Sequence, residues 1–276
     1  MIVQNNWFDI QKISESGQCF RLVKIGENKY RTIHLDNYLE IERVSDDTTI
    51  LNCSLMDYNN IWKSYFDLDN NTTYQKFLET VDSYDGQGAE YIKQSIISAK
   101  GIRILKQDKW ETLISFIISQ RNSIPRIAKS VERLSEHLGV GGKHEKGYFF
   151  AFPTYSSILE NPYIVSDLGL GYRDVYIIKA AKTVAQCGIE SINSFNRAKQ
   201  LYGIGDKVAN CYCLYGLHQL DAFPIDTWVQ KILDKEFNGS TEFLVHFKGY
   251  EGLLQQCMFY HERKVSNKLV TLKTDY

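Results

Sequence analysis

The hydrophobic pattern of the first hundred residues differs from that of the rest of the chain. Within residues 30–43, apolar and polar residues alternate on both sides of a turn expected at Asp36 and Asn37. This alternation, with β-branched and aromatic residues at the apolar positions, predicts a β-hairpin. Residues 17–23 and 48–53 are expected to add strands, which predicts an antiparallel sheet over about residues 5–55. A mixed, mainly helical pattern follows up to about residue 100.

After Gly101 the pattern has the period of an α-helix. Residues 110–118 are nearly all apolar, which predicts a helix that is buried on most of its faces. The next helix is amphipathic and is expected to end at the glycines of residues 139–142. Its apolar residues recur at spacings of four, three and four: Ile127, Val131, Leu134 and Leu138. Residues 173–187 repeat the pattern and stop at Gly188.

The remaining helices lie around a glycine turn. A short helix is expected at residues 194–201, followed by a turn at 203–205 and a helix to about Gly216. Asp226 suits the N-cap of another helix. The expected fold class is therefore α+β, with an N-terminal antiparallel sheet domain followed by a mainly α-helical domain. The expected boundaries are 1–100 for the sheet domain with flanking helices, 101–262 for the helical domain and 263–276 for a C-terminal tail.

Composition and charge exclude several classes of protein. The hydrophobic fraction of 43% and the charged fraction of 24% are those of a globular chain, not of a disordered or fibrous one. With a net charge of −1, the chain has no overall positive field, so a nucleic-acid partner would need local cations and backbone donors. No stretch approaches the roughly 18 apolar residues of a membrane span, and no export signal is evident. We therefore expect a cytoplasmic protein that does not bind membranes.

The six cysteines show neither a Cys-x-x-Cys pair nor the spacing of a metal site. In a cytosolic chain of this size they are expected to be reduced and mostly packed in the core. The pattern also argues against a cysteine-held iron–sulfur cluster.

The most informative segment is 201–228, which contains a Gly-x-Gly turn between two expected helices. Gly203, Ile204 and Gly205 predict a tight helical hairpin, with Ile204 anchored in the core. The helix after the turn presents unpaired N–H groups, which can bind an anion such as a DNA phosphate. A turn of this kind alone is weak evidence, because many helix–helix corners contain one.

Lys207 and Asp226 each allow two interpretations. Lys207, in the first turn of a helix, is either a solvated surface lysine or an amine nucleophile. Since the pKa of a lysine amine is ordinarily about 10.4, a neutral amine near pH 7 costs about 4–5 kcal/mol, and substrate desolvation must supply most of it. Asp226 is either a helix cap or a carboxylate that stabilises a developing cation. The two roles of Asp226 are compatible.

These residues resemble a known family. Residues 201–226 are similar to the helix-hairpin-helix and Gly/Pro-Asp signature of base-excision DNA glycosylases, and Lys207 stands where the bifunctional glycosylase/lyases carry their lysine. Within that superfamily, the likeness is strongest to the 8-oxoguanine DNA glycosylase/AP lyase family. Segments similar to other motifs of this family occur in the same order, at 17–21, 110–139, 168–173 and 252–259.

The resemblance implies a catalytic pair and a base pocket. Lys207 would attack C1′ of the damaged nucleotide and form a Schiff base, followed by β-elimination that nicks the strand. Asp226 would hold the lysine and stabilise the sugar cation. The carbonyl of Gly17 would accept the N7 hydrogen that distinguishes 8-oxoguanine from guanine. In the base pocket, Gln255 would contact the Watson–Crick edge, while Phe259 and Cys211 would sandwich the base, although core packing is the alternative for both.

The resemblance also implies contacts to the rest of the duplex. Arg126 and Arg173 would contact the opposite cytosine, with Asn122 beside them, and Tyr172 would wedge into the base stack. Gly203 and Gly205 would bind phosphate, and Trp228 stands where the family has a phosphate-binding histidine. In a second departure from the family, Arg121 replaces the asparagine that fills the gap left by the flipped base. No metal or other cofactor is implied. The partner implied is double-stranded DNA containing 8-oxoguanine, bound by a monomer with no obligate protein partner in a prokaryotic cytoplasm.

Two alternatives remain open at this stage. One is a related glycosylase for another damaged base. Adenine-removing and endonuclease-III-like relatives typically carry four cysteines near the C-terminus, where this chain has only Cys257, and alkyl-purine glycosylases generally lack the lysine. The other alternative is a non-catalytic helix-hairpin-helix protein that binds DNA phosphates. Its DNA binding would survive loss of Lys207, and it would never cut a strand.

Overall fold

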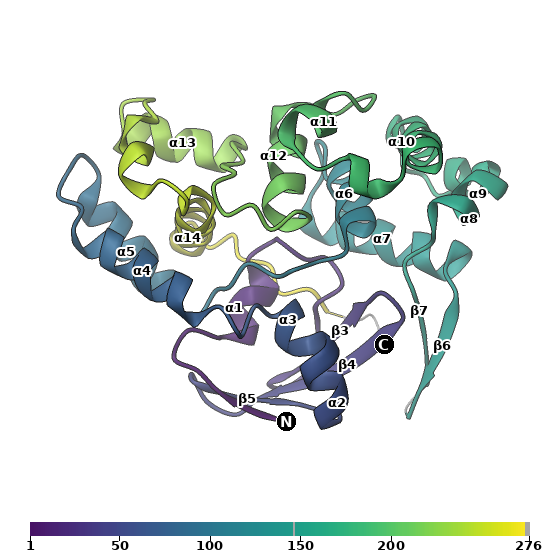
Figure 1. Cartoon of the computed structure of the whole chain (residues 1–276), viewed down its shortest axis with the longest axis horizontal. Helices are drawn as coiled ribbons and strands as arrows, with labels where there is room; N and C mark the ends of the chain where they lie inside the picture. Colours follow the sequence, from purple (N-terminus) through teal and green to yellow (C-terminus); the bar gives the residue numbers. More distant parts are fainter. Residues whose placement is uncertain (146, 274–276) are drawn as a thin grey trace.

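An antiparallel sheet and a larger helical layer make up the chain, and they lie one above the other in Figure 1. The computed structural model describes residues 1–145 and 147–273. The sheet has five strands in the order β1-β5-β4-β3-β2. Its strands are β1 (Ile2–Gln4), β2 (Val23–Gly26), β3 (Lys29–His34), β4 (Asn37–Arg43) and β5 (Thr48–Leu51). The α+β class and the N-terminal sheet are therefore confirmed.

The turn of the predicted hairpin lies one residue earlier than expected. Asn37 pairs with His34 across the strands, so the turn consists of Leu35 and Asp36, and Leu35 has the unusual φ of +55°. The register is set by the core, because Leu39 and Ile41 of β4 are buried against the rest of the chain. A slip of one residue would turn these side chains to the opposite face.

Residues 17–22 do not form the strand that the sequence predicted, and α1 (Ile10–Glu15) lies inside the expected sheet. Hydrogen bonds from the fully buried side chain of Gln18 hold this segment, in place of the backbone hydrogen bonds of a strand. Its Nε2 donates to the carbonyl of Arg103 at 2.8 Å, and its Oε1 accepts the N–H of Leu105 at 2.8 Å. This contact ties the segment to a distant part of the chain, which local patterning does not reveal.

The helical layer contains the predicted helices. The apolar segment 110–118 lies in α6 (Lys109–Ile118), the amphipathic segment forms α7 (Ile124–Leu138), and α10 (Arg173–Cys187) has the expected bounds. The other helices are α2 (Leu55–Asp57), α3 (Lys63–Tyr65), α4 (Asn71–Asp82), α5 (Ala89–Ala99), α8 (Tyr155–Glu160), α9 (Pro162–Asp167), α11 (Phe195–Lys199), α12 (Asp206–Tyr215), α13 (Thr227–Glu236) and α14 (Glu251–Val265), with a π-helical turn at Tyr58–Trp62 and 3₁₀ turns at Ile189–Ser191 and Glu242–Phe247.

A second hairpin follows α7, where the sequence predicted only a glycine-rich helix end. It consists of β6 (Gly141–His144) and β7 (Gly147–Phe150). The ring of His144 stacks on Tyr38 of β4, with centroids 4.0 Å apart, so the hairpin contacts the sheet layer.

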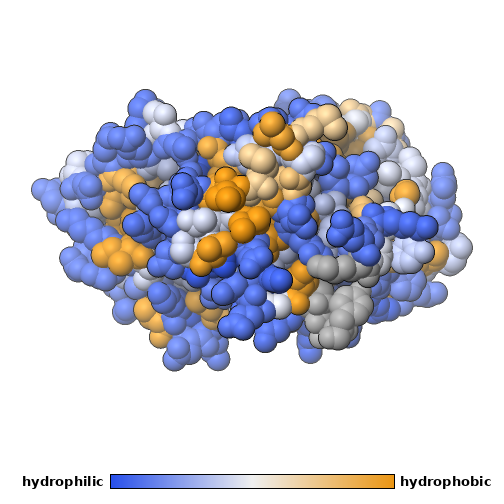
Figure 2. Space-filling model, turned by 90° about the horizontal axis from the view of Figure 1, so that it is seen from below, coloured by the Kyte–Doolittle hydropathy of each residue, from blue (hydrophilic) through white to orange (hydrophobic). Residues whose placement is uncertain are grey.

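The apolar core has two parts, one in each layer. The helical part includes residues of α4 and α5, and α5 packs against α14. The C-terminal segment returns to the sheet, where the N–H of Lys24 donates to the carbonyl of Leu272 at 2.7 Å. The division of the chain at residues 100 and 262 stays a prediction. The face on the sheet side is mostly hydrophilic, with a few apolar areas near its middle (Figure 2).

Candidate active site

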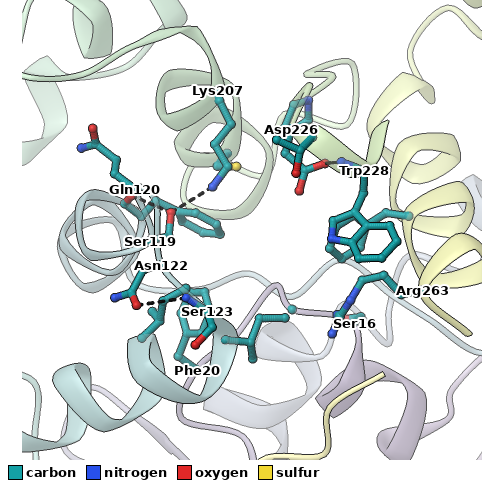
Figure 3. A pocket seen from close by; sticks show the side chains of 18 of the residues that line it. Ser16, Phe20, Ser119, Gln120, Asn122, Ser123, Lys207, Asp226, Trp228 and Arg263 are labelled. Atoms are coloured by element: carbon teal, nitrogen blue, oxygen red, sulfur yellow. Dashed lines mark hydrogen bonds between the residues drawn. The ribbon is translucent and has the colours of Figure 1, made fainter. Parts of the chain in front are cut away.

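A cavity of about 730 Å³ opens within the helical layer. Its walls are the loop between α6 and α7, the first part of α12, the segment leading into α13, and α14, while residues 16–20 contribute a further side. Figure 3 shows Lys207 and Ser119 on one side of the cavity, with Asp226 and Trp228 on another. Segments that are far apart in the sequence thus converge on one space.

Eight of the predicted site residues line this cavity. They are Gly17, Asn122, Lys207, Cys211, Asp226, Trp228, Gln255 and Phe259. The other five predicted residues lie outside the lining, in the segments around it: Arg126, Tyr172, Arg173, Gly203 and Gly205. The location of a residue does not by itself show what the residue does, so the roles of these residues stay predictions.

The helical hairpin that precedes Lys207 forms as the sequence predicted. Gly203 has a φ of +80°, and a Cβ atom there would lie 2.4 Å from the ring of Tyr176. Glycine is therefore required by both conformation and space. Gly205 caps α12, and nothing lies within 4 Å of the position of its Cβ. The first turn of α12 therefore faces open space at this glycine.

The amine of Lys207 contacts uncharged groups. Its Nζ donates to Ser119 Oγ at 2.9 Å and lies 5.2 Å from the centroid of the Phe116 ring. The Cys211 thiol also interacts with Lys207. Burial raises the pKa of this thiol to about 11, so Cys211 is a neutral thiol near pH 7. Within residues 1–145 and 147–273, no carboxylate forms an ion pair with Lys207.

Asp226 caps α13, as predicted. Its Oδ1 accepts the backbone N–H groups of Trp228 and Val229, each at 2.9 Å. The carboxylate also lines the cavity. Its second oxygen, Oδ2, takes no part in these cap bonds, so one side chain can both begin the helix and face a ligand.

The base-pocket candidates line the same cavity, and one of them, Gln255, carries a buried unpaired oxygen. Gln255 is only 4% exposed, and in the described part of the chain its Oε1 has no hydrogen-bond partner. A buried amide oxygen without a partner is costly, which favours a ligand that donates to it. Gly17 has a φ of +76°, and a Cβ there would lie 3.2 Å from Ile124 and 3.5 Å from Phe259.

Several lining residues were missed at the sequence level. Phe116 stacks on Tyr215 with centroids 5.3 Å apart, and Phe20 meets Phe116 edge-on at 5.6 Å. The guanidinium of Arg263 lies 5.2 Å from the Phe259 ring, and burial lowers the pKa of Arg263. Phe116 and Tyr215 carry no signal that separates them from core residues, because both lie in apolar helices. Phe20 lies in the motif at 17–21, and that motif is the one sequence signal that could have identified it as a lining residue.

The residues expected to contact the opposite strand lie at the edge of this site. Arg126 is exposed on α7, and Tyr172 is 44% exposed before α10. Arg173 donates from Nε to the carbonyl of Gln120 at 2.9 Å and from Nη1 to that of Leu170 at 3.0 Å. It thus ties the α6–α7 loop to the loop that holds Tyr172.

The cavity wall also includes Arg121, Asn122 and Trp228. Arg121 has a φ of +48° and lines the cavity. Asn122 donates to the carbonyl of Ile118 at 3.2 Å. Lys231 lies 5.2 Å from the Trp228 ring. Among the residues that the structure describes, no cluster of histidine, cysteine, aspartate and glutamate could hold a metal, and no helix is long and apolar enough to span a membrane.

The hairpin, the lysine after it and the aspartate cap beside one cavity define the helix-hairpin-helix DNA glycosylase class. Residues 1–113 match the family model described as 8-oxoguanine DNA glycosylase, N-terminal domain. The N-glycosylase/DNA lyase of Saccharomyces cerevisiae is 30% identical over 201 residues, which are 65% of this chain and 52% of the yeast protein. The aligned part of the chain spans about half the length of the curated relatives it matches.

Two solved structures are similar over nearly the whole chain. The structure of MBOgg1 in complex with a low-affinity DNA ligand has a TM-score of 0.86 at 29% identity and covers 96% of each chain. The Clostridium acetobutylicum 8-oxoguanine glycosylase/lyase, in complex with double-stranded DNA containing cytosine opposite 8-oxoguanine, has a TM-score of 0.83 at 28% identity, covering 96% of this chain and 98% of that one. The chain thus has the fold of solved 8-oxoguanine glycosylases, and its first 113 residues match the family model of their N-terminal domain.

Proposed function

We propose that this protein is a bifunctional DNA repair enzyme that excises 8-oxoguanine from duplex DNA opposite cytosine and then nicks the strand as an AP lyase. The observation that carries the proposal is the convergence of Lys207, Asp226, Gly17 and Gln255 on one cavity. The relatives named N-glycosylase/DNA lyase and 8-oxoguanine glycosylase/lyase support it.

Lys207 is the proposed nucleophile. The lone pair of its neutral amine forms a bond to C1′ of the damaged nucleotide, while the bond from C1′ to the base breaks and its electrons leave with the base, which takes up a proton. Opening of the sugar ring gives a protonated Schiff base. Loss of a C2′ proton then expels the 3′ phosphate by β-elimination, which cuts the strand.

Asp226 is the proposed electrostatic partner in this reaction. Positive charge develops on the sugar as the base departs, and a fixed carboxylate lowers the energy of that state. The two cap bonds from the N–H groups of Trp228 and Val229 hold the carboxylate in place before substrate arrives. Because the cap is part of the fold, no reorganisation of Asp226 is needed during the reaction.

The remaining cavity residues form the proposed base pocket. Excision requires the damaged base to leave the helix and enter a protein pocket. The carbonyl of Gly17 accepts the N7 hydrogen of 8-oxoguanine, and guanine would leave that acceptor unpaired, which gives about 1–3 kcal/mol of discrimination. The unpaired Oε1 of Gln255 accepts from the Watson–Crick edge, which carries N–H donors. Phe259 and Cys211 lie against the two faces of the base.

The duplex is proposed to lie across α7 and α10. These helices carry six lysine and arginine residues and three carboxylates, a local charge of about +3 on a chain of net charge −1. Arg126 and Arg173 contact the opposite cytosine, with Asn122 beside them, and Tyr172 enters the base stack. The N–H groups at Gly203 and Gly205 bind phosphate, and the Trp228 indole N–H replaces the family's histidine.

The proposed partner is therefore double-stranded DNA, bound by a monomer. The expected prokaryotic cytoplasm stays a prediction, and the matched relatives include a yeast protein and a plant protein.

Borohydride trapping tests the proposed function. The duplex carries one 8-oxoguanine opposite cytosine, and the proteins compared are the intact chain, Lys207→Gln and Lys93→Gln, which removes an exposed lysine of α5 outside the cavity lining. We expect a covalent protein–DNA product from the intact chain and from Lys93→Gln, and none from Lys207→Gln. Release of free base without trapping would instead show a monofunctional glycosylase. Binding without either product would show a DNA-binding protein.

A further inference from the structure

Ser119 is the C-cap residue of α6 and lies at the wall of the cavity, where it is 8% exposed. Its Oγ donates to the carbonyl of Phe116 at 2.7 Å and receives the bond from Lys207 Nζ at 2.9 Å. A serine hydroxyl has one proton and two lone pairs. Because the proton is used on Phe116, Ser119 meets Lys207 only as an acceptor (Figure 3).

No other oxygen in the described part of the chain accepts a hydrogen bond from the Lys207 amine. The Phe116 ring presents an aromatic surface, and Cys211 is a buried neutral thiol. Asp226 directs Oδ1 to its cap bonds. In the described part of the chain, Ser119 Oγ is the oxygen that holds the Lys207 amine.

We propose that Ser119 is a positioning residue for Lys207, one that holds the amine with its lone pair turned away from Ser119. The inference rests on the proposed function, because it concerns the nucleophile named there. A neutral amine has two N–H bonds and one lone pair. When one N–H donates to Ser119, the lone pair takes one of the two remaining positions on the nitrogen, both turned away from Ser119, and stays available for C1′ of a bound nucleotide. Ser119 acts through Lys207 and makes no contact with the substrate.

The structure holds Ser119 itself in a fixed place. Its backbone N–H donates to the carbonyl of Ser115 at 3.0 Å, in the last turn of α6. The next residue, Gln120, accepts the Nε bond from Arg173 at 2.9 Å. The hydroxyl therefore sits between a helix end and a tethered loop, which is the kind of rigid support that a nucleophile needs for orientation.

Two substitutions at Ser119 and one matched control test the inference. Ser119→Ala removes the hydroxyl, and Ser119→Thr keeps it. Ser135→Ala removes another buried hydroxyl, which donates to the carbonyl of Val131 at 3.0 Å on α7, outside the cavity lining. Each protein is compared with the intact chain in single-turnover borohydride trapping on a preformed abasic site. Affinity for a duplex carrying a tetrahydrofuran abasic analogue and thermal unfolding are measured alongside.

We expect Ser119→Ala to trap about 10- to 100-fold more slowly than the intact chain, as loss of a hydrogen bond to a catalytic amine predicts. Its affinity for the analogue should change by less than about twofold, because the lost contact is not a DNA contact. Ser119→Thr should restore most of the rate. Ser135→Ala should lower the unfolding temperature and leave trapping unchanged.

Trapping by Ser119→Ala at the rate of the intact chain would overturn the inference, as would a loss of rate that follows DNA affinity or that Thr does not rescue. If Ser119→Ala does not fold, Ser119→Cys replaces it. The sulfur is a weak acceptor of similar size, so slower trapping supports the inference and an unchanged rate refutes it. Failure of the intact chain to trap or excise would be a different result, because it would refute the proposed function itself.

Discussion

Asp226 is both the N-cap of α13 and a negative charge at the cavity, and two substitutions can separate these roles. Its Oδ1 accepts two backbone N–H bonds of 2.9 Å, which begin α13, and its negative charge faces the cavity. Asparagine keeps an oxygen acceptor and is about as good an N-cap as aspartate, whereas alanine removes both the cap and the charge. We expect Asp226→Asn to lose chemistry alone and Asp226→Ala to lose chemistry and stability.

The magnitudes follow from the cap geometry. Loss of an N-cap costs about 1 kcal/mol, which corresponds to about 2–4 °C in the unfolding temperature of a chain of this size. Asp226→Asn should therefore unfold within about 1 °C of the parent. In both variants, base excision should slow by about 100-fold or more, the usual cost of removing one preorganised electrostatic contact to a transition state.

Thermal unfolding and single-turnover excision of 8-oxoguanine are the two measurements. Thr154→Ala is the matched control, because Thr154 caps α8 through a 3.1 Å bond from the N–H of Ser157 and does not line the cavity. It should lose stability like Asp226→Ala and keep full activity. Full excision activity in Asp226→Asn would refute the electrostatic role and leave Asp226 as a cap.

Three further predictions concern pH, backbone strain and salt. Burial raises the pKa of Glu111 to about 7 against the opposing effect of Arg21, so the folded state holds this proton at higher pH than the unfolded chain does. The stability that this group contributes therefore falls as pH rises from about 4.5 to 7. Over that interval the free energy of unfolding of Glu111→Gln, measured with denaturant, should gain up to about 3 kcal/mol relative to the parent. A difference between the two proteins that does not change with pH would contradict this. Gly203→Ala should weaken DNA binding and stability together, because its Cβ would strike Tyr176. Gly239→Ala, with a φ of +75° and only an ordinary contact of 3.7 Å with the Asp234 side chain, should cost about 1 kcal/mol of stability alone. Finally, contact with about three to five phosphates predicts a slope of about −3 to −4.5 for log binding constant against log salt, and a slope near −10 would reveal a larger ionic interface.

Much of the helical layer was determined by local sequence. The helices at 109–118, 124–138 and 173–187 follow from apolar residues at helical spacing and from the residues that end them. The Gly203 turn and the Asp226 cap could also be predicted from the sequence, since each depends on the chemistry of a few consecutive residues. Lys207 and Asp226 could therefore be singled out before their positions were known.

Tertiary structure decided what local patterns do not contain. The turn at Leu35 and Asp36 follows from which strand residues face the core, and residues 17–22 are held by the side chain of Gln18 in place of a strand ladder. Ser119 becomes a candidate only when α6 and α12 meet at one cavity, because a serine at a helix end has no distinctive spacing. Helix periodicity and helix caps depend on residues up to four apart, so the sequence by itself determined them. The site depends on contacts between residues about 90 to 240 apart in the sequence, which only the packed chain brings together.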